Sequence, residues 1–194
     1  DRWRSLTGFA EARLGRRIAR AELSLRAEVE ALRYLNNAQE LRDLDRTVLL
    51  LTGYYNSGPK LSVVVQPRVA FIDYEESVSL LDSREMSLVG GLRWEATART
   101  SGEVKIGIER KRFEASEFSD DTHLRWQADL LWEPRTFSKV RVSTGQRSAE
   151  STEAGSSLVA SRVQIAWTHG FSTRLTATTG ARFEVADFSG GRRD

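Results

Sequence analysis

Cysteine is absent from this chain of 194 residues, and only three prolines and one methionine occur. Without cysteine the protein has no disulfide bond, no thiolate metal site and no cysteine nucleophile. Long hydrophobic runs are also lacking, since no stretch reaches the roughly 18 apolar residues that predict a transmembrane helix. Neither charge is in large excess, because 29 basic and 27 acidic residues leave a net charge of +2. This near balance argues against a nucleic acid as partner.

Taken in bulk, the composition is that of a soluble globular domain. Charged residues make up 29% of the chain, hydrophobic residues 40%, and the mean hydropathy is negative. A membrane β-barrel gives similar totals, because it exposes apolar side chains to lipid in every second residue only. The order of the residues is therefore more informative than their totals.

The segment from Ile18 to Leu35 shows this order most clearly. Apolar residues occupy every second position from Ala19 to Ala31, and charged or polar residues lie between them. A helix with this spacing would have no apolar face, whereas a strand places all the apolar side chains on one side. Helix propensity is the weaker signal, so we predict a strand.

The same alternation recurs along the chain and predicts ten strands. Further clear examples are Leu6–Leu14, Leu88–Ala98, Val104–Ile108, Leu124–Trp132, Val163–Trp167 and Leu175–Val185. The segment Thr47–Leu51 is apolar on both faces. Pro67 lies within the strand predicted at Leu61–Phe71 and indicates a β-bulge, because proline cannot donate to a strand ladder.

The links between these strands alternate in length. Short links are expected at residues 15–17, 56–59, 100–102, 133–136 and 169–172, and longer polar ones at 36–43, 75–84, 114–121 and 148–157. Short turns at one rim and long loops at the other are typical of outer-membrane barrels. We therefore predict an all-β fold, an antiparallel up-and-down transmembrane β-barrel. Both ends of the chain fall in long links, so residues 1–194 are expected to form one segment of a larger barrel.

Aromatic residues gather toward both ends of the predicted strands, as in the two interfacial girdles of such barrels. The alternative is that they form the core of a soluble β-sandwich. The girdle at the short-turn rim is predicted to contain Tyr54, Trp94, Trp132, Trp167 and Phe171. The aromatic residues toward the loop rim are Tyr34, Tyr74, Phe113, Phe118, Phe183 and Phe188.

The polar face of the alternation would line the barrel interior. Such a mixture of charges either lines a water-filled conduit or forms cross-strand ion pairs that plug it, and the sequence leaves both open. The predicted lumen-lining residues are Arg20, Arg26, Arg68, Arg93, Glu95, Arg99, Lys105, Glu109, Arg125, Asp129, Arg174 and Arg182.

Catalytic and metal-binding patterns are not recognisable, so we expect neither an enzyme nor a bound cofactor or metal. His123 is placed at a loop rim and His169 in a short turn, where solvated side chains are the simplest expectation. Oxygen ligands for Ca²⁺ could come from Asp120 and Asp121 with Glu114 and Glu117, but their spacing matches no defined calcium loop.

Two stretches resemble a known family. They are Gly90-Gly91-Leu92-Arg93-Trp94, followed by residues 102–108 and Arg112-Phe113, and Leu130–Thr136, followed by residues 147–151. Both are similar to strand-turn patterns of the porin-like β-barrel family encoded with bacterial exopolysaccharide and exosortase loci. The resemblance implies a protein of the Gram-negative cell outer membrane that assists polysaccharide export or surface assembly.

The partners implied by this resemblance are the lipid bilayer, polysaccharide and periplasmic export machinery. Two alternatives remain open at this point. One is a scaffold barrel of the outer membrane that does not conduct, and the other is a soluble β-sandwich or barrel that acts as a binding domain.

Overall fold

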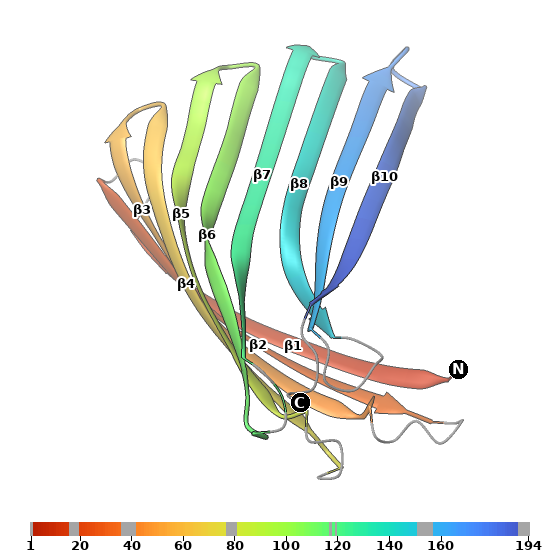
Figure 1. Ribbon diagram of the computed structural model, residues 1–194. Helices are drawn as coiled ribbons and strands as arrows, with labels where there is room; N and C mark the ends of the chain where they lie inside the picture. Colours follow the sequence, from red (N-terminus) through yellow and green to blue (C-terminus); the bar gives the residue numbers. More distant parts are fainter. Residues whose placement is uncertain are drawn as a thin grey trace.

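Ten antiparallel strands make up the computed structural model, which describes residues 2–15, 20–35, 42–76, 81–116, 118, 120–150 and 157–189. They form one sheet in which every strand pairs with its neighbours in sequence (Figure 1). The predicted all-β, up-and-down antiparallel architecture is confirmed. The strands are β1 (Trp3–Leu14), β2 (Ala21–Tyr34), β3 (Leu44–Gly58), β4 (Leu61–Tyr74), β5 (Ser83–Thr97), β6 (Thr100–Phe113), β7 (Asp121–Arg135), β8 (Ser138–Glu150), β9 (Ser157–Gly170) and β10 (Thr176–Ser189).

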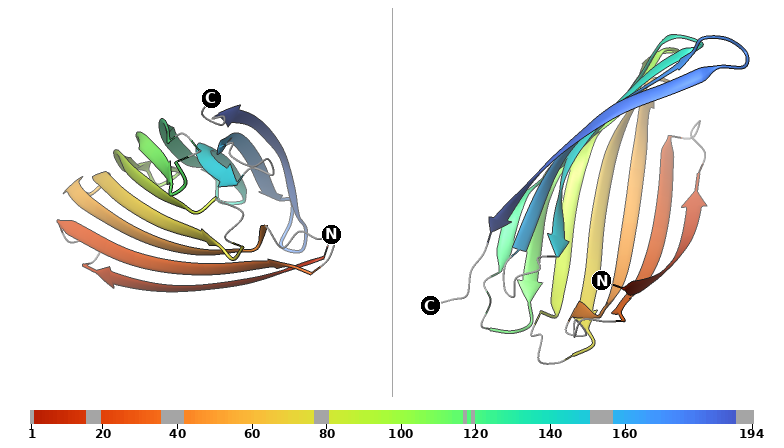
Figure 2. Two further views of the ribbon diagram at one scale, coloured as in Figure 1. Left: turned by 60° about the horizontal axis from the view of Figure 1, so that its bottom comes forward. Right: turned by 90° about the vertical axis from the view of Figure 1, so that its right-hand side faces the viewer.

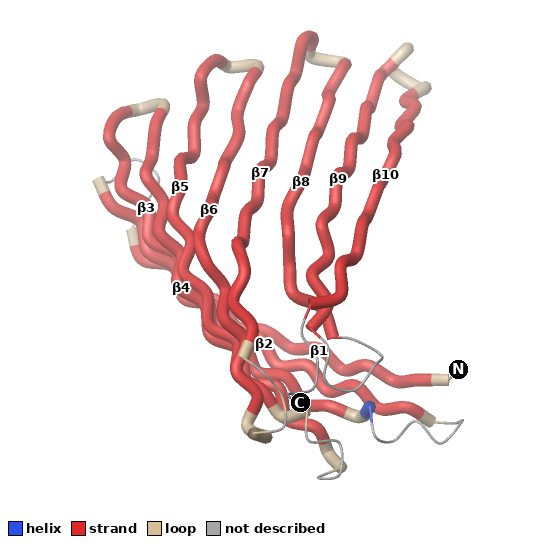
Figure 3. Tube along the Cα trace, in the orientation of Figure 1, coloured by secondary structure: helices blue, strands red, loops and turns tan. Residues whose placement is uncertain are grey.

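The sheet is strongly curved and open. Two further views show it as a trough, with β1 along one edge and β10 along the other (Figure 2). Strand dominates the described residues, and short turns join the strands at one rim (Figure 3). No pairing between β1 and β10 occurs among the described residues. Within these ranges, no helix is long and apolar enough to cross a membrane.

The predicted alternation of link lengths is present, but several turns lie elsewhere than expected. Two-residue turns occur at Pro59–Lys60, Ala98–Arg99 and Thr136–Phe137, and longer links occupy residues 75–82 and 114–120. The turn predicted at residues 100–102 is wrong, because these residues begin β6. Gly102 was interpreted as a turn residue, but it lies within a strand. A Cβ atom at this position would clash with the ring of Trp94, so the glycine serves close packing inside the sheet.

Pro67 does not produce the predicted bulge. It pairs with Leu88 of β5, and the register of β4 with β3 is the same on both sides of it. The register shift between β3 and β4 lies between Asn56 and Gly58 instead, next to the turn. Pro67 is accommodated without an inserted residue, and the strand continues through it.

The two faces of the sheet differ as the alternation predicts. Large apolar side chains on one face are exposed, including Leu88 at 54%, Ile106 at 58% and Ile108 at 61%. The opposite face carries most of the charged side chains of the central strands. Tyr54 on β3 reaches Glu103 on β6 there, with 3.1 Å between the hydroxyl and carboxylate oxygens. Because β3 and β6 are three strands apart, roughly 14 Å in a flat sheet, this polar face is the concave one.

Two inner-face glycines allow the sharp curvature at β5 and β6. A Cβ atom at Gly91 would overlap the backbone of β6, and one at Gly107 would overlap the backbone of β5. Gly90 contrasts with them on the outer face, where a Cβ atom would meet only a carbonyl oxygen at 3.7 Å. The close approach of the β5 and β6 backbones at these positions therefore requires glycine.

Candidate functional site: the charged inner face

Two buried carboxylates form the centre of the inner face. Glu85 on β5 and Glu109 on β6 are 1% and 0% exposed. Arg68 on β4 lies between them, with its Nη1 atom 3.0 Å from Glu85 and 3.6 Å from Glu109. Arg46 on β3 and Lys111 on β6 also contact Glu85, at 3.4 and 4.0 Å. The cluster compensates both buried charges with cations from three strands, as buried charges require.

Glu109 extends this cluster to β7. Its carboxylate pairs with Arg125 and lies 3.4 Å from Nε2 of His123. His123 also contacts Asp121, at 3.6 Å from Nδ1. The expectation of a solvated histidine at a loop rim is wrong, because residue 123 belongs to β7 and its side chain points inward to these two carboxylates.

A second cluster lies nearer the short turns. The guanidinium of Arg93 on β5 stacks 3.7 Å from the ring centroid of Tyr54 and reaches Glu22 on β2 at 3.5 Å. Glu103 accepts the hydrogen bond from Tyr54 and lies 2.8 Å from Nζ of Lys105. This cluster joins β2, β3, β5 and β6. Tyr54 is therefore not part of an outer girdle, because its even position in β3 directs it to the concave face.

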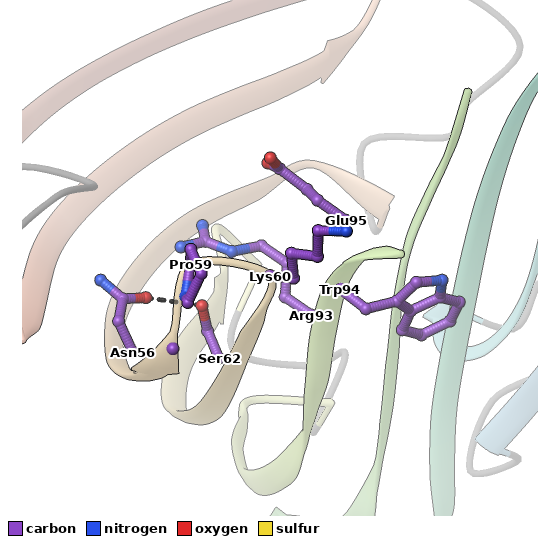
Figure 4. A pocket seen from close by; sticks show the side chains of 8 residues that line it. Asn56, Pro59, Lys60, Ser62, Arg93, Trp94 and Glu95 are labelled. Atoms are coloured by element: carbon purple, nitrogen blue, oxygen red, sulfur yellow. Dashed lines mark hydrogen bonds between the residues drawn. The ribbon is translucent and has the colours of Figure 1, made fainter. Parts of the chain in front are cut away.

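A cavity of about 210 Å³ opens beside the second cluster at the turn-side rim. Asn56, Ser62, Arg93 and Glu95 line it, and Ser62 donates a hydrogen bond to Asn56 at 2.5 Å (Figure 4). The figure shows Trp94 turned away from Lys60 and toward the next strands. The side chains of Arg93 and Trp94 thus point to different sides of β5, although both residues contribute to the cavity lining.

The inner face is more open across β7 to β10. One cavity of about 340 Å³ lies between Arg125, Gln127, Ser143 and Arg162. Another of about 350 Å³ is lined by Arg93, Asp129 and Arg141, among others. Amide, hydroxyl, carboxylate and guanidinium groups surround both spaces. The ion-pair clusters therefore lie on β2 to β7, whereas these two cavities extend along β5 to β9.

The predicted lumen-lining residues divide between strands and turns. Three of them lie in short turns at the rim: Arg20, Arg99 and Arg174. The other nine lie on the inner face of strands: Arg26, Arg68, Arg93, Glu95, Lys105, Glu109, Arg125, Asp129 and Arg182. That any of them lines a pore stays a prediction.

Sequence reasoning missed several charged residues of this face, among them Glu85, Arg46, Arg141 and Glu103. Glu85 was not predicted because the residues before it were assigned to a loop. Arg46 and Arg141 were not predicted because they lie in strands whose alternation is weak. The signal was nevertheless available. Counting back from Arg93 in steps of two reaches Glu85, and such residues share one face of a strand.

The turn-side aromatics, apart from Tyr54, lie on the outer face or in a turn. Trp132 and Trp167 are outward and 48% and 41% exposed, and Phe171 lies in the β9–β10 turn. His169 belongs to β9, and not to a solvated turn as predicted. Its ring contacts those of Trp167 and Phe171, with centroids 5.3 and 4.6 Å apart. An aromatic cluster thus marks this end of the outer apolar face.

The aromatics at the loop rim do not form a matching belt. Tyr34, Tyr74 and Phe113 lie at inner positions of β2, β4 and β6, and Phe118 is buried. The side chain of Phe188 is outside the described residues. The prediction of an aromatic girdle at this rim is therefore wrong for the inward-facing residues, because their strand parity places them on the concave side.

Residues 5–194 match the profile of the family described as "Putative beta-barrel porin 2". The chain belongs to this family. No curated protein and no solved structure matches the chain. The two faces of the sheet agree with this membership, since transmembrane β-barrels expose apolar side chains on the outside and polar ones on the inside.

Proposed function

We propose that this porin-like barrel protein lies in the cell outer membrane of a Gram-negative bacterium. The observation that carries the proposal is the exposed aliphatic surface on one face only. On β2, outward apolar side chains run from Leu23 to Ala31. Eight residue steps cover about 26 Å along the strand and roughly 20 Å across a bilayer after tilting, close to the ~25 Å apolar band of such barrels.

An open sheet cannot span a bilayer by itself, because its unpaired edges would leave backbone groups without hydrogen-bond partners in lipid. The proposal therefore includes further strands that pair with the free edges of β1 and β10. They could come from the same chain or from another.

Within the membrane, we propose that the charged inner face lines a conduit. The cavities along β5 to β9 support a water-filled path, because charged side chains of both signs line them. Hydroxyl groups of sugars can pair with the same amide, carboxylate and guanidinium groups. Together with the family resemblance, this favours a role in exopolysaccharide export or surface assembly, with no catalytic step in the protein itself.

Two measurements test the proposal in sequence. The protein extracted in detergent is expected to migrate differently on a gel with and without heating, as folded membrane barrels do; migration that heating does not change, together with solubility without detergent, would refute the membrane placement. Purified protein in a planar bilayer is then expected to give single-channel current steps. A folded, inserted protein without current above background would refute the conduit.

A scaffold barrel is the second candidate function, and the ion-pair clusters favour it. Arg93, Tyr54 and Glu103 connect strands across the concavity, and Glu85 and Glu109 fix the centre. If these clusters close the lumen, the protein anchors a surface assembly without conducting. Co-purification with periplasmic export partners, combined with absent current, would identify this role.

A strain lacking the protein separates an export role from a general pore. Exopolysaccharide outside the cell is expected to decrease and to be restored by the wild-type chain. Unchanged secretion together with normal channel activity would refute the export role and leave the pore.

A further inference from the structure

The outer face has different chemistry at its two rims. At the turn side, the outward strand positions of the described residues carry mainly apolar, aromatic, small or hydroxyl side chains and His169. Arg135 is a charged exception, because it pairs with Ser138 beyond the register shift of β7. At the loop side, charged side chains project outward just beyond the apolar band. They are Arg4, Arg33, Asp45, Asp73, Arg84, Arg110 and Arg112.

The arginines on β5 and β6 are the most concentrated part of this rim. Arg84 is directly opposite Arg112 in the strand pairing, and Arg110 lies two residues away on the same face. Side chains at directly opposed positions have Cβ atoms about 5 Å apart, and like charges there destabilise the sheet. An anion held between the guanidinium groups would offset this repulsion.

Among the described residues, two of these arginines share one carboxylate oxygen. Oδ2 of Asp120 lies 2.9 Å from Nη2 of Arg110 and 3.5 Å from Nε of Arg112. The side chains of Arg110 and Arg112 remain 51% and 57% exposed. Arg84 lies over the ring of Phe71, with its Cζ atom 4.8 Å from the ring centroid. Arg84, Arg110 and Arg112 thus occupy neighbouring positions on one face, and their side chains are accessible from outside.

Arg4 on β1 and Arg33 on β2 lie at the same rim, but their charges are compensated differently. These arginines are also directly opposite each other. Arg33, however, is compensated by Asp45 at 2.8 Å and Glu75 at 3.0 Å. Two separate carboxylates hold one arginine there, whereas one carboxylate is shared by two arginines on β6.

On the outer face of β5 and β6, the surface between these arginines and the turn-side rim is apolar. Leu88, Leu92, Ile106 and Ile108 project outward from the same two strands and are 43–61% exposed. Gly90 lies between the two leucines on the same face. An anionic lipid has a phosphate group, which the arginines can bind, and hydrocarbon chains, which the apolar surface can contact. A free anion would use the arginines but not the apolar surface.

We propose that Arg84, Arg110 and Arg112 bind the phosphate group of a lipid whose acyl chains lie against Leu88, Ile106 and Ile108. Guanidinium groups suit this role because they remain charged and bind phosphate oxygens through paired hydrogen bonds. The site is on the outer face and is independent of conduction. It rests only on the membrane placement proposed above.

The test uses the full protein in detergent micelles and three probes. They are a diphosphorylated, multiply acylated lipid, the same lipid without phosphate, and inorganic phosphate alone. Native mass spectrometry measures the bound lipid. Wild-type protein is expected to retain the phosphorylated lipid and to lose it at least tenfold more readily after Arg84→Gln or Arg112→Gln, since each variant removes charge-assisted hydrogen bonds. Arg13→Gln, an exposed arginine on the inner face, is the matched control and is expected to change binding less than twofold.

A second variant tests the same site in the opposite direction. Asp120→Asn removes the carboxylate that competes for Arg110 and Arg112, so affinity for the phosphorylated lipid is expected to rise severalfold. Equal retention of the lipid without phosphate, or no effect of any variant, overturns the proposal. Competition by inorganic phosphate at the same concentration as the lipid also overturns it, because the site is then a simple anion site. Failure of the protein to insert into membranes is a separate result that refutes the proposed membrane placement.

Discussion

Glu109 provides the strongest test of how the inner face is stabilised. Its carboxylate is fully buried and contacts Arg125, Arg68 and His123. Substitution by glutamine keeps the shape of the side chain but removes its charge. In this variant Arg68 keeps its ion pair with Glu85 at 3.0 Å, whereas Arg125 loses its ion pair with residue 109.

The expected cost follows from this loss of compensation. Removing one partner of a buried ion pair destabilises proteins by about 3–5 kcal/mol, because the other charge stays buried without a partner. Arg125 is about one quarter exposed, so the lower end applies. We expect Glu109→Gln to reduce the free energy of unfolding by about 3 kcal/mol, which is roughly a 150-fold change in the unfolding equilibrium constant.

Glu28→Gln is a matched control on the same concave face. Glu28 pairs with Arg26 at 2.5 Å, but both side chains are more than one third exposed. Water screens such pairs, so the expected loss is about 1 kcal/mol or less. Unfolding by denaturant in detergent, followed by the fluorescence of the five tryptophans, measures both variants. Equal destabilisation by the two substitutions, or a loss below about 1 kcal/mol for Glu109→Gln, would refute the reasoning.

Three further predictions concern curvature, membrane contact and permeation. Gly107→Ala is expected to lower stability by about 2 kcal/mol because its Cβ atom overlaps the backbone of β5, whereas Gly90→Ala, with an open outer face, should have little effect in the same unfolding assay. Ile106→Arg places a charge on the 58% exposed outer face, between Val104 and Ile108, and is expected to reduce the free energy of folding in lipid vesicles by about 2–4 kcal/mol; an unchanged free energy would show that this face does not contact lipid. Arg141→Glu is expected to shift the reversal potential of the channel toward cation selectivity, while Ser143→Ala in the same cavity should leave it unchanged.

The alternation of side chains was sufficient to predict much of this fold. The pattern from Ala19 to Ala31 identified β2 against its helix propensity, and the same parity separated the apolar from the charged face in most other strands. Turn positions were less predictable. Glycine at position 102 was taken as a turn residue, although it packs beneath Trp94 within the sheet. Glycine marks both tight turns and close backbone contacts, and the sequence does not distinguish them.

The sequence by itself determined the two-residue period, and with it the strands, their order and the face of most charged residues. This follows because side chains alternate across a strand whatever its neighbours are. Only the tertiary structure decided which charges meet. Arg93 reaches Glu22 and Tyr54 reaches Glu103 because the sheet curves, so that strands three apart approach one another on the concave side. Curvature also separated the buried Glu109 from the exposed Glu28, which the sequence presents as equivalent charges on one polar face.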